Sequence, residues 1–226
     1  EHGDLLDVIR EANGFRAFKD VIAEARAFLR SPVSDYEPAP RQASPAPKGS
    51  PEAARRLFAM SRPISGTLAE AYLRNRGITG LRGTGSLRFH GSCYYLPDEV
   101  SETEIWPALI AAVTNLDGRI VGVQRTWLDP DGFDVTRLGK APIETPRRAM
   151  GDLLGYGVRF GLTDDVMAAG EGIETMLSLR CALSDLPTVA ALSAAHLAAI
   201  QFPNTLRRLY IARDDDEAGD TATTTL

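Results

Sequence analysis

The chain has 226 residues, of which 44% are hydrophobic and 24% charged, and its formal net charge is −5. These values are typical of a globular protein with enough residues for one large domain or two modest ones. No apolar stretch approaches the roughly 18 to 20 residues that a membrane-spanning helix needs, and the first residues lack the basic start and apolar segment of a signal peptide. We therefore expect a cytoplasmic protein with no membrane partner.

The two cysteines limit the chemistry that sulfur can provide. Cys93 and Cys181 are too few for a disulfide framework or for a zinc site within this chain. Because Cys181 lies in the apolar helical segment 176–183, we expect it to be a reduced thiol in the core.

Charge is distributed unevenly along the chain. Residues 52–160 contain 14 Lys and Arg against 12 Asp and Glu, whereas residues 161–226 contain 4 against 10. An acidic module beside a slightly basic one fits a metal site placed next to a surface that binds a polyanion.

The first 51 residues predict a helical segment followed by a linker. Apolar residues recur at helical spacing in residues 3–30, and a break at Asn13-Gly14 divides them into a helical pair. Residues 31–51 contain six prolines among Ser, Ala and charged residues, a composition that cannot bury a core. We therefore expect a helical tail at 1–30 and a Pro-rich linker at 31–51.

Residues 52–160 predict an α+β subdomain. Helices are expected at 52–60 and 67–76, and strands at 87–95, 107–114 and 119–128. The last two strands flank Asn115-Leu116-Asp117-Gly118, which predicts a hairpin turn with Asp-Gly at its tip. Residues 129–160 are rich in Gly, Pro and Arg, so we expect an irregular, functional loop region there.

Residues 161–226 predict a parallel sheet with crossover helices. Strands are expected at 165–169, 187–192 and 206–212, and helices at 173–183, 194–200 and from 217 onward. Such β-α-β-α-β alternation is typical of a parallel sheet with right-handed connections. The sequence ends at Leu226 within the last of these helices, so we expect this domain to be truncated.

Acidic residues follow two of the predicted strands directly. Glu171 comes after the first strand, while Asp214 and Asp216 come after the third. Gly172, directly after Glu171, is expected to bind a nucleotide, because the flexible backbone of glycine permits a tight approach to phosphate. Ligand sites of open α/β sheets gather at the carboxyl ends of the strands. Three carboxylates there repel one another unless a hard divalent cation lies between them, which predicts a catalytic Mg²⁺ or Mn²⁺ site. Glu174, one helical turn after Glu171, either supports that residue or favours the helix N-terminus by its charge.

These motifs resemble those of the Toprim domain, which bacterial primases, topoisomerases and certain nucleases share. Glu171 matches the invariant glutamate of that family, and Asp214 and Asp216 match its Asp-x-Asp metal ligands. The segment 191–197 is similar to the small-residue turn after the second Toprim strand. By this resemblance Ser193 lines the site, whereas His196, on the following helix, is expected to be structural.

The upstream sequence is similar to the catalytic core of bacterial-type primases. The segments that carry this similarity are 71–78, 110–123, 139–146 and 154–157, and residues 3–9 resemble the tail that follows a primase zinc ribbon. The overall pattern is similar to that of primase-like Toprim proteins of mobile elements and phages. It implies a truncated α/β Toprim domain at 161–226, preceded by an α+β primase-core subdomain at 52–160 and an N-terminal helical segment.

The resemblance implies synthesis of short RNA primers on single-stranded DNA from ribonucleoside triphosphates, with a replicative helicase as a further partner. Lys140 is the only lysine in residues 52–226 and could hold a triphosphate as a point charge. Arg119 and Arg125 could bind phosphates or the template bidentately. Two alternatives stay open, a Toprim nuclease or topoisomerase-like enzyme and a module that binds nucleic acid without catalysis.

Overall fold

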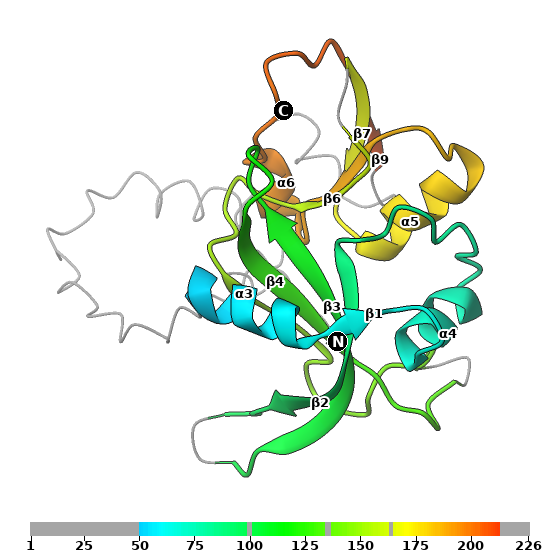
Figure 1. Cartoon of the computed structure of the whole chain (residues 1–226), viewed down its shortest axis with the longest axis vertical. Coiled ribbons are helices and arrows are strands. Elements are labelled where there is room, and N and C mark those ends of the chain that lie inside the picture. Colours follow the sequence, from blue (N-terminus) through cyan, green and yellow to red (C-terminus); the bar gives the residue numbers. More distant parts are fainter. Residues whose placement is uncertain (1–49, 99–100, 134–136, 163–164, 213–226) are drawn as a thin grey trace, which may run out of the picture. The chain divides into compact units, whose positions relative to one another are not determined.

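Two β-sheets share one apolar core in the computed structural model, which describes residues 50–98, 101–133, 137–162 and 165–212 (Figure 1). The predicted helical pair at 3–30, residues 31–49 of the predicted linker, and Asp214 and Asp216 lie outside these residues. None of the helices within the described ranges is long and apolar enough to cross a membrane.

The first sheet has five strands that pair antiparallel in chain order. They are β1 (Arg62–Pro63), β2 (Leu87–Tyr95), β3 (Glu104–Thr114), β4 (Ile120–Trp127) and β5 (Arg147–Gly151). The predicted turn joins β3 and β4. The Asn115 N–H donates to the Arg119 carbonyl at 3.1 Å, and Gly118 has a φ of +76°, a conformation that glycine adopts without strain.

The prediction of an irregular region at 129–160 is wrong for two short stretches, because β5 and β6 (Val158–Phe160) lie within it. Both are edge strands, and neither contains an apolar run long enough to indicate a strand by itself. β5 is held by its pairing with β4, in which Gln124 lies opposite Ala149. The sequence of an edge strand is a weak signal because only one neighbour and little burial specify it.

The second sheet has four strands in the order β6-β8-β7-β9. Besides β6, these are β7 (Val166–Gly170), β8 (Thr188–Ala190) and β9 (Arg208–Ala212). β7 pairs parallel with both β8 and β9, as the alternation predicts, whereas β6 pairs antiparallel with β8. The sheet is therefore mixed, with a parallel part that carries the predicted acidic turn.

Helices cover the sheets on several sides. They are α3 (Pro51–Met60), α4 (Leu68–Asn75), α5 (Ile173–Ala182) and α6 (Ala194–Ala198). α3 packs with Trp127 and Val123 on one face of the first sheet, and α6 packs with Met167 and Val189 on one face of the second. α4 and α5 share a third cluster that both sheets line. The two sheets thus lie on either side of a common core.

α3 begins inside the range that we assigned to the linker. Ser50 is the N-cap, its hydroxyl accepts the Ala53 N–H at 3.2 Å, and Pro51 is the first helical residue. Pro is favoured at this position because its missing N–H has no partner in the first turn anyway.

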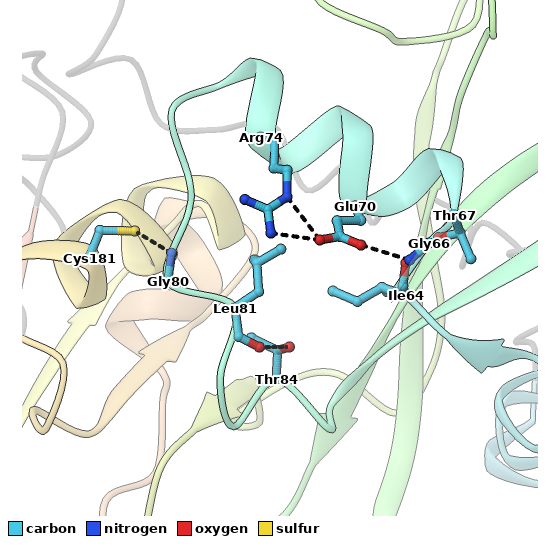
Figure 2. A network of polar contacts seen from close by, with 9 residues as sticks. All are labelled: Ile64, Gly66, Thr67, Glu70, Arg74, Gly80, Leu81, Thr84 and Cys181. Carbon is cyan, nitrogen blue, oxygen red and sulfur yellow. Dashed lines mark hydrogen bonds and ion pairs between the residues drawn. The ribbon is translucent and has the colours of Figure 1, made fainter.

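The start of α4 is fixed by a network of polar contacts (Figure 2). Glu70 accepts the Gly66 N–H at 2.7 Å and forms an ion pair with Arg74 one turn later, also at 2.7 Å. The carboxylate thereby satisfies a backbone donor before the helix and suits the positive end of the helix dipole. This network sets where α4 begins.

Cys181 is exposed, so the prediction of a core thiol is wrong. It lies in the last turn of α5, where its sulfur accepts the Gly80 N–H at 3.3 Å (Figure 2). The core face of the helix is supplied by Ile173, Met176 and Leu177 in the preceding turns.

Gly170 occupies the tightest place in the second sheet. A Cβ atom there would lie 2.6 Å from the Ala212 carbonyl oxygen and 2.7 Å from the Met176 Cε atom. We predict that Gly170→Ala lowers the free energy of unfolding by about 1–3 kcal/mol, measured by urea denaturation, because the backbone of β9 cannot yield without loss of pairing. Gly85→Ala is the matched control, since no atom lies within 4 Å of its added Cβ. Equal stability of the two variants would contradict the prediction.

Candidate active site

A cleft of about 380 Å³ opens where the edge of the first sheet meets the carboxyl ends of β7 and β8. One wall comes from β4 and β5, and the other from the turns that lead into α5 and α6. The lining residues are Gln124, Arg147, Arg148, Ala149, Glu171, Gly172, Ile173, Glu174, Leu192, Ser193 and His196. Three of the residues that the sequence analysis selected, Glu171, Gly172 and Ser193, meet in this cleft.

The turn that carries Glu171 is fixed by its neighbours. Gly170, the last residue of β7, pairs with Ala212, the last residue of β9. The carbonyl oxygens of Gly170 and Glu171 accept the N–H groups of Ala191 and Leu192 at 2.8 and 2.9 Å. The turns after β7 and β8 are therefore joined through the backbone, which holds the start of α5 beside the start of α6.

Ser193 and His196 form the second turn of the cleft. Ser193 is the N-cap of α6, and its hydroxyl accepts the His196 N–H at 3.2 Å. Leu192, directly before it, has a φ of +80°. A bulky residue in this conformation stores strain, and such strain concentrates at functional sites. His196 lines the cleft as well as belonging to α6.

Glu174 does not serve merely as a favourable charge at the start of α5. Its carboxylate lies 2.5 Å from the Arg147 Nη2 atom of β5 and accepts the Tyr72 hydroxyl of α4 at 2.5 Å. Only 14% of the Glu174 side chain and 36% of the Arg147 side chain are exposed. The Arg147 Nη2 atom also lies 3.4 Å from the Tyr72 oxygen. Three elements distant in sequence thus meet in one polar cluster beside Glu171.

The pKa values of the cluster reflect its burial and its charges. Burial alone would raise the pKa of Glu174, but the Arg147 charge and the Tyr72 hydrogen bond lower it below its ordinary value. Burial and the Glu174 charge raise the pKa of Tyr72 to about 12. Burial lowers the pKa of Arg147, but Glu174 and Tyr72 outweigh it and raise that pKa. At neutral pH the cluster therefore holds one anion, one cation and one neutral phenol.

Lys140 lies within the electrostatic range of this cluster. Its backbone pairs antiparallel with that of Leu128, the residue directly after β4, so Lys140 lies beside the end of that strand. Burial and the charges of Arg147 and Arg76 lower its pKa, while the charge of Glu174 opposes that shift. The structure thus brings Lys140 near Glu174 and Arg147, although it is not among the lining residues of the cleft.

The two predicted arginines are not brought to the cleft. Arg119 is exposed at the base of the β3–β4 turn. Arg125 alternates with Gln124 on β4, so it points to the opposite face of the sheet, where its guanidinium lies 4.9 Å from the Trp127 ring centroid. There it lines a second pocket of about 720 Å³ with Tyr94, Leu96, Thr103, Trp127 and Arg148.

Three residues at or beside the cleft were not predicted from the sequence: Arg147, Arg148 and Tyr72. The two arginines lie in the region that we expected to be irregular, and the adjacent pair Arg147-Arg148 after Pro146 is the one signal that pointed to them. Tyr72 lies in a predicted helix with nothing in its local sequence to distinguish it from a core aromatic residue. Its partner Glu174 is 102 residues away, so no local pattern could identify the contact.

The structure describes only one of the three carboxylates that were predicted to hold a metal ion. Among the residues of those ranges, no group of three or more His, Cys, Asp and Glu side chains could hold a metal ion. Glu171 is the one predicted ligand that the structure describes. The other two, Asp214 and Asp216, follow β9 in the sequence. The last residue of β9, Ala212, pairs with Gly170, which directly precedes Glu171.

The lowered pKa of Glu174 predicts how the stability depends on pH. Because the folded state favours the carboxylate, the ion pair contributes fully above the ordinary pKa of 4.5 and is lost as the pH falls toward the lower folded-state pKa. We expect the parent to exceed Glu174→Gln by about 1–2 kcal/mol in urea denaturation at pH 7, a value discounted for the exposure of Arg147. The difference should shrink between pH 4.5 and 3.

The matched control for this titration is Glu102→Gln, which removes an exposed carboxylate. We expect its stability to follow that of the parent at each pH. A difference between the parent and Glu174→Gln that stays constant from pH 7 to pH 3 would contradict the prediction.

Comparisons with known proteins agree with this architecture. Residues 48–160 match the model of a family described as a domain of unknown function (DUF7146), and residues 166–226 match the Toprim domain. No curated protein matches the sequence significantly.

Two crystal structures of bacterial primases are similar in fold. The zinc-binding and RNA polymerase domains of Aquifex aeolicus primase match with a TM-score of 0.50 and 14% identity, over 99% of this chain and 60% of that one. The Escherichia coli primase catalytic core matches with a TM-score of 0.50 and 12% identity, over 77% of this chain and 65% of that one. The chain thus spans less than two thirds of either structure.

The resemblance to the Toprim domain and to primase cores is therefore confirmed at the level of the domain and the fold. The model for residues 48–160 covers half of the sequence. The protein belongs to the DUF7146 family, and in it this region is followed by a Toprim domain in a fold shared with bacterial primase cores.

Proposed function

We propose that this protein is a primase-type nucleotidyltransferase that makes short RNA primers on single-stranded DNA. The observation that supports this most directly is the composition of the cleft. An acidic turn with Glu171 faces a wall that carries Arg147 and Arg148. Carboxylates that can hold a divalent cation, beside cations that can bind phosphate, are what phosphoryl transfer requires.

In this proposal Glu171, Asp214 and Asp216 hold Mg²⁺ or Mn²⁺. Glu171 follows Gly170, and Asp214 is two residues beyond Ala212, the partner of Gly170 in the sheet. A chain of two residues spans up to about 7 Å, so the Asp214 carboxylate is able to meet that of Glu171. The ion, when bound, neutralises phosphate charge and lowers the pKa of the attacking hydroxyl.

The cations around the cleft bind the nucleotide. Arg147 presents a guanidinium that suits a phosphate bidentately, and Lys140 supplies a compact charge nearby. Gly172, the N-cap of α5, has no side chain to cap this ten-residue helix, and the positive end of the helix suits an anion. Ser193 adds a hydroxyl on the same wall of the cleft. These groups orient the triphosphate of an incoming ribonucleotide.

The pocket on the other face of the first sheet suits a template strand. Arg125 and Arg148 offer positive charge, and Trp127 and Tyr94 offer aromatic surface. The Arg125 guanidinium lies over the Trp127 ring, 4.9 Å from its centroid, so charge and aromatic surface adjoin in this pocket. Single-stranded nucleic acid is bound by such combinations of backbone charge and stacking. Arg119 extends the positive surface, and a replicative helicase is the protein partner that we propose.

Template-directed synthesis of labelled oligoribonucleotides with Mg²⁺ tests the proposal. We expect Glu171→Gln and Asp214→Ala to reduce synthesis at least about 100-fold, because each removes a metal ligand. EDTA should abolish synthesis, and excess Mg²⁺ should restore it. Asp215→Asn is the matched control, since the sequence pattern predicts that residue 215 faces away from residues 214 and 216. It should stay within about 2-fold of the parent.

Other outcomes favour the two alternatives. Cleavage of the template that depends on Asp214 would replace the proposal with a Toprim nuclease. Tight binding of single-stranded DNA with neither synthesis nor cleavage would replace it with a non-catalytic module. Synthesis that survives Glu171→Gln would contradict the assignment of the site.

A further inference from the structure

Tyr72 lies at the centre of contacts that the proposed mechanism does not use. It belongs to α4 and is fully buried, with an exposed fraction of 0%. Its hydroxyl donates to Glu174 on α5 at 2.5 Å and lies 3.4 Å from the Arg147 Nη2 atom on β5. One side chain therefore contacts the start of the Toprim helix and the arginine wall of the cleft.

The ring of the same tyrosine supports the backbone before Lys140. A Cβ atom added to Gly139 would lie 3.2 Å from the Tyr72 Cδ2 atom and 3.0 Å from the Phe133 ring. Gly139 also has a φ of +85°, so both space and conformation require glycine there. On the other side, the Arg76 guanidinium lies 5.2 Å from the Tyr72 ring centroid. The loop is pressed against the ring.

Backbone hydrogen bonds transmit this contact to Lys140. The Gly139 N–H donates to the Gly132 carbonyl at 2.6 Å, and the Asp129 N–H donates to the Gly139 carbonyl at 3.1 Å. The Lys140 N–H donates to the Arg137 carbonyl at 3.1 Å. Residues 139 and 140 thus have little freedom once the ring of Tyr72 is in place.

We propose that Tyr72 is a positioning residue, whose ring fixes the Lys140 loop and whose hydroxyl fixes the Glu174–Arg147 pair, so that the cations and the acidic turn of the cleft keep one geometry. The consequence of this role for nucleotide binding rests on the proposed function. The role of Tyr72 in holding the loop and the ion pair does not depend on that function.

A role in packing alone does not explain the hydroxyl. Phenylalanine would fill the same volume with no polar atom to bury, and burying a hydroxyl is unfavourable unless it is hydrogen-bonded. Here the hydroxyl donates to a carboxylate that is itself only 14% exposed and that also accepts from Arg147. Two side-chain donors at one carboxylate fix its orientation better than an ion pair alone does.

Hydrogen exchange measured by mass spectrometry on the protein without nucleotide separates the two contacts. Tyr72→Phe keeps the ring and loses the hydroxyl. We expect exchange in the first turns of α5, residues 173–177, to rise at least 3-fold, with residues 137–141 unchanged. Gly139→Ala pushes the loop away from the ring, so exchange should rise at 137–141 and stay unchanged at 173–177. Tyr72→Leu should raise both.

Thr84→Val is the matched control. Thr84 is buried, and its hydroxyl donates to the Leu81 carbonyl at 2.8 Å, outside the Tyr72 cluster and away from the cleft. The substitution removes one buried hydroxyl, as Tyr72→Phe does, and should leave exchange at 173–177 unchanged. If Tyr72→Phe and the control variant alter exchange at 173–177 equally, or if neither alters it, the proposal is overturned. Gly139→Ala tests the contact between the loop and the ring by itself, even where Tyr72→Leu fails to fold.

Binding of GTP with Mg²⁺ tests the functional consequence. Tyr72→Phe should weaken the affinity at least about 5-fold, whereas Thr84→Val, at similar stability, should stay within 2-fold. Equal effects of the two variants would show that Tyr72 acts through stability alone and would overturn the positioning role. If the unsubstituted protein does not bind GTP, the proposed function is wrong, and the exchange measurements still decide whether Tyr72 couples the two segments.

Discussion

The core that the two sheets share determines where everything else in the described structure can lie. One continuous cluster contains Leu109 of the first sheet, Ala190 of the second, and Met176 of α5 between them. Because the inner faces of both sheets must remain dry, polar groups can collect only at the rim of this core. The cleft occupies that rim, where β4 and β5 face the turns that lead into α5 and α6. Burial thus places the cleft, and side chains then give it chemistry.

The half-buried ion pair between Glu174 and Arg147 is better explained by geometry than by stability. Removing Glu174 from water is unfavourable, and attraction to Arg147 with one hydrogen bond from Tyr72 offsets that penalty with little surplus. Apolar residues of similar volume could be as stable. Apolar residues cannot fix the orientation of the helix in the same way. Dispersion contacts tolerate small rotations, whereas a carboxylate with two donors does not. Glu174 lies in the first turn of α5, directly after the turn that carries Glu171, so this contact also limits the movement of that turn.

Whether a feature of this structure could be predicted from the sequence depends on how far apart in the chain the interacting residues lie. β2 was predicted at 87–95 and is found there, because its alternating burial is a local pattern, and the turn before Arg119 follows from Asp-Gly. Glu171 and Ser193 meet because the parallel alternation fixes which strand ends share an edge. Edge strands, the exposure of Cys181 and the partner of Glu174 depend on contacts between residues 21 to 102 positions apart, which no local pattern encodes.

β5, which local patterns failed to indicate, is also where the two candidate binding surfaces meet. Its residues alternate between faces, so Arg147 and Ala149 lie on the same side as Gln124, while Arg148 lies opposite Arg125. Arg148 lines both the cleft and the pocket on the far face. An edge strand rich in arginine also resists pairing with a further strand, because charge at an open edge disfavours it. A single short strand therefore stays exposed and contributes arginines to both surfaces, which lie within one side chain of each other.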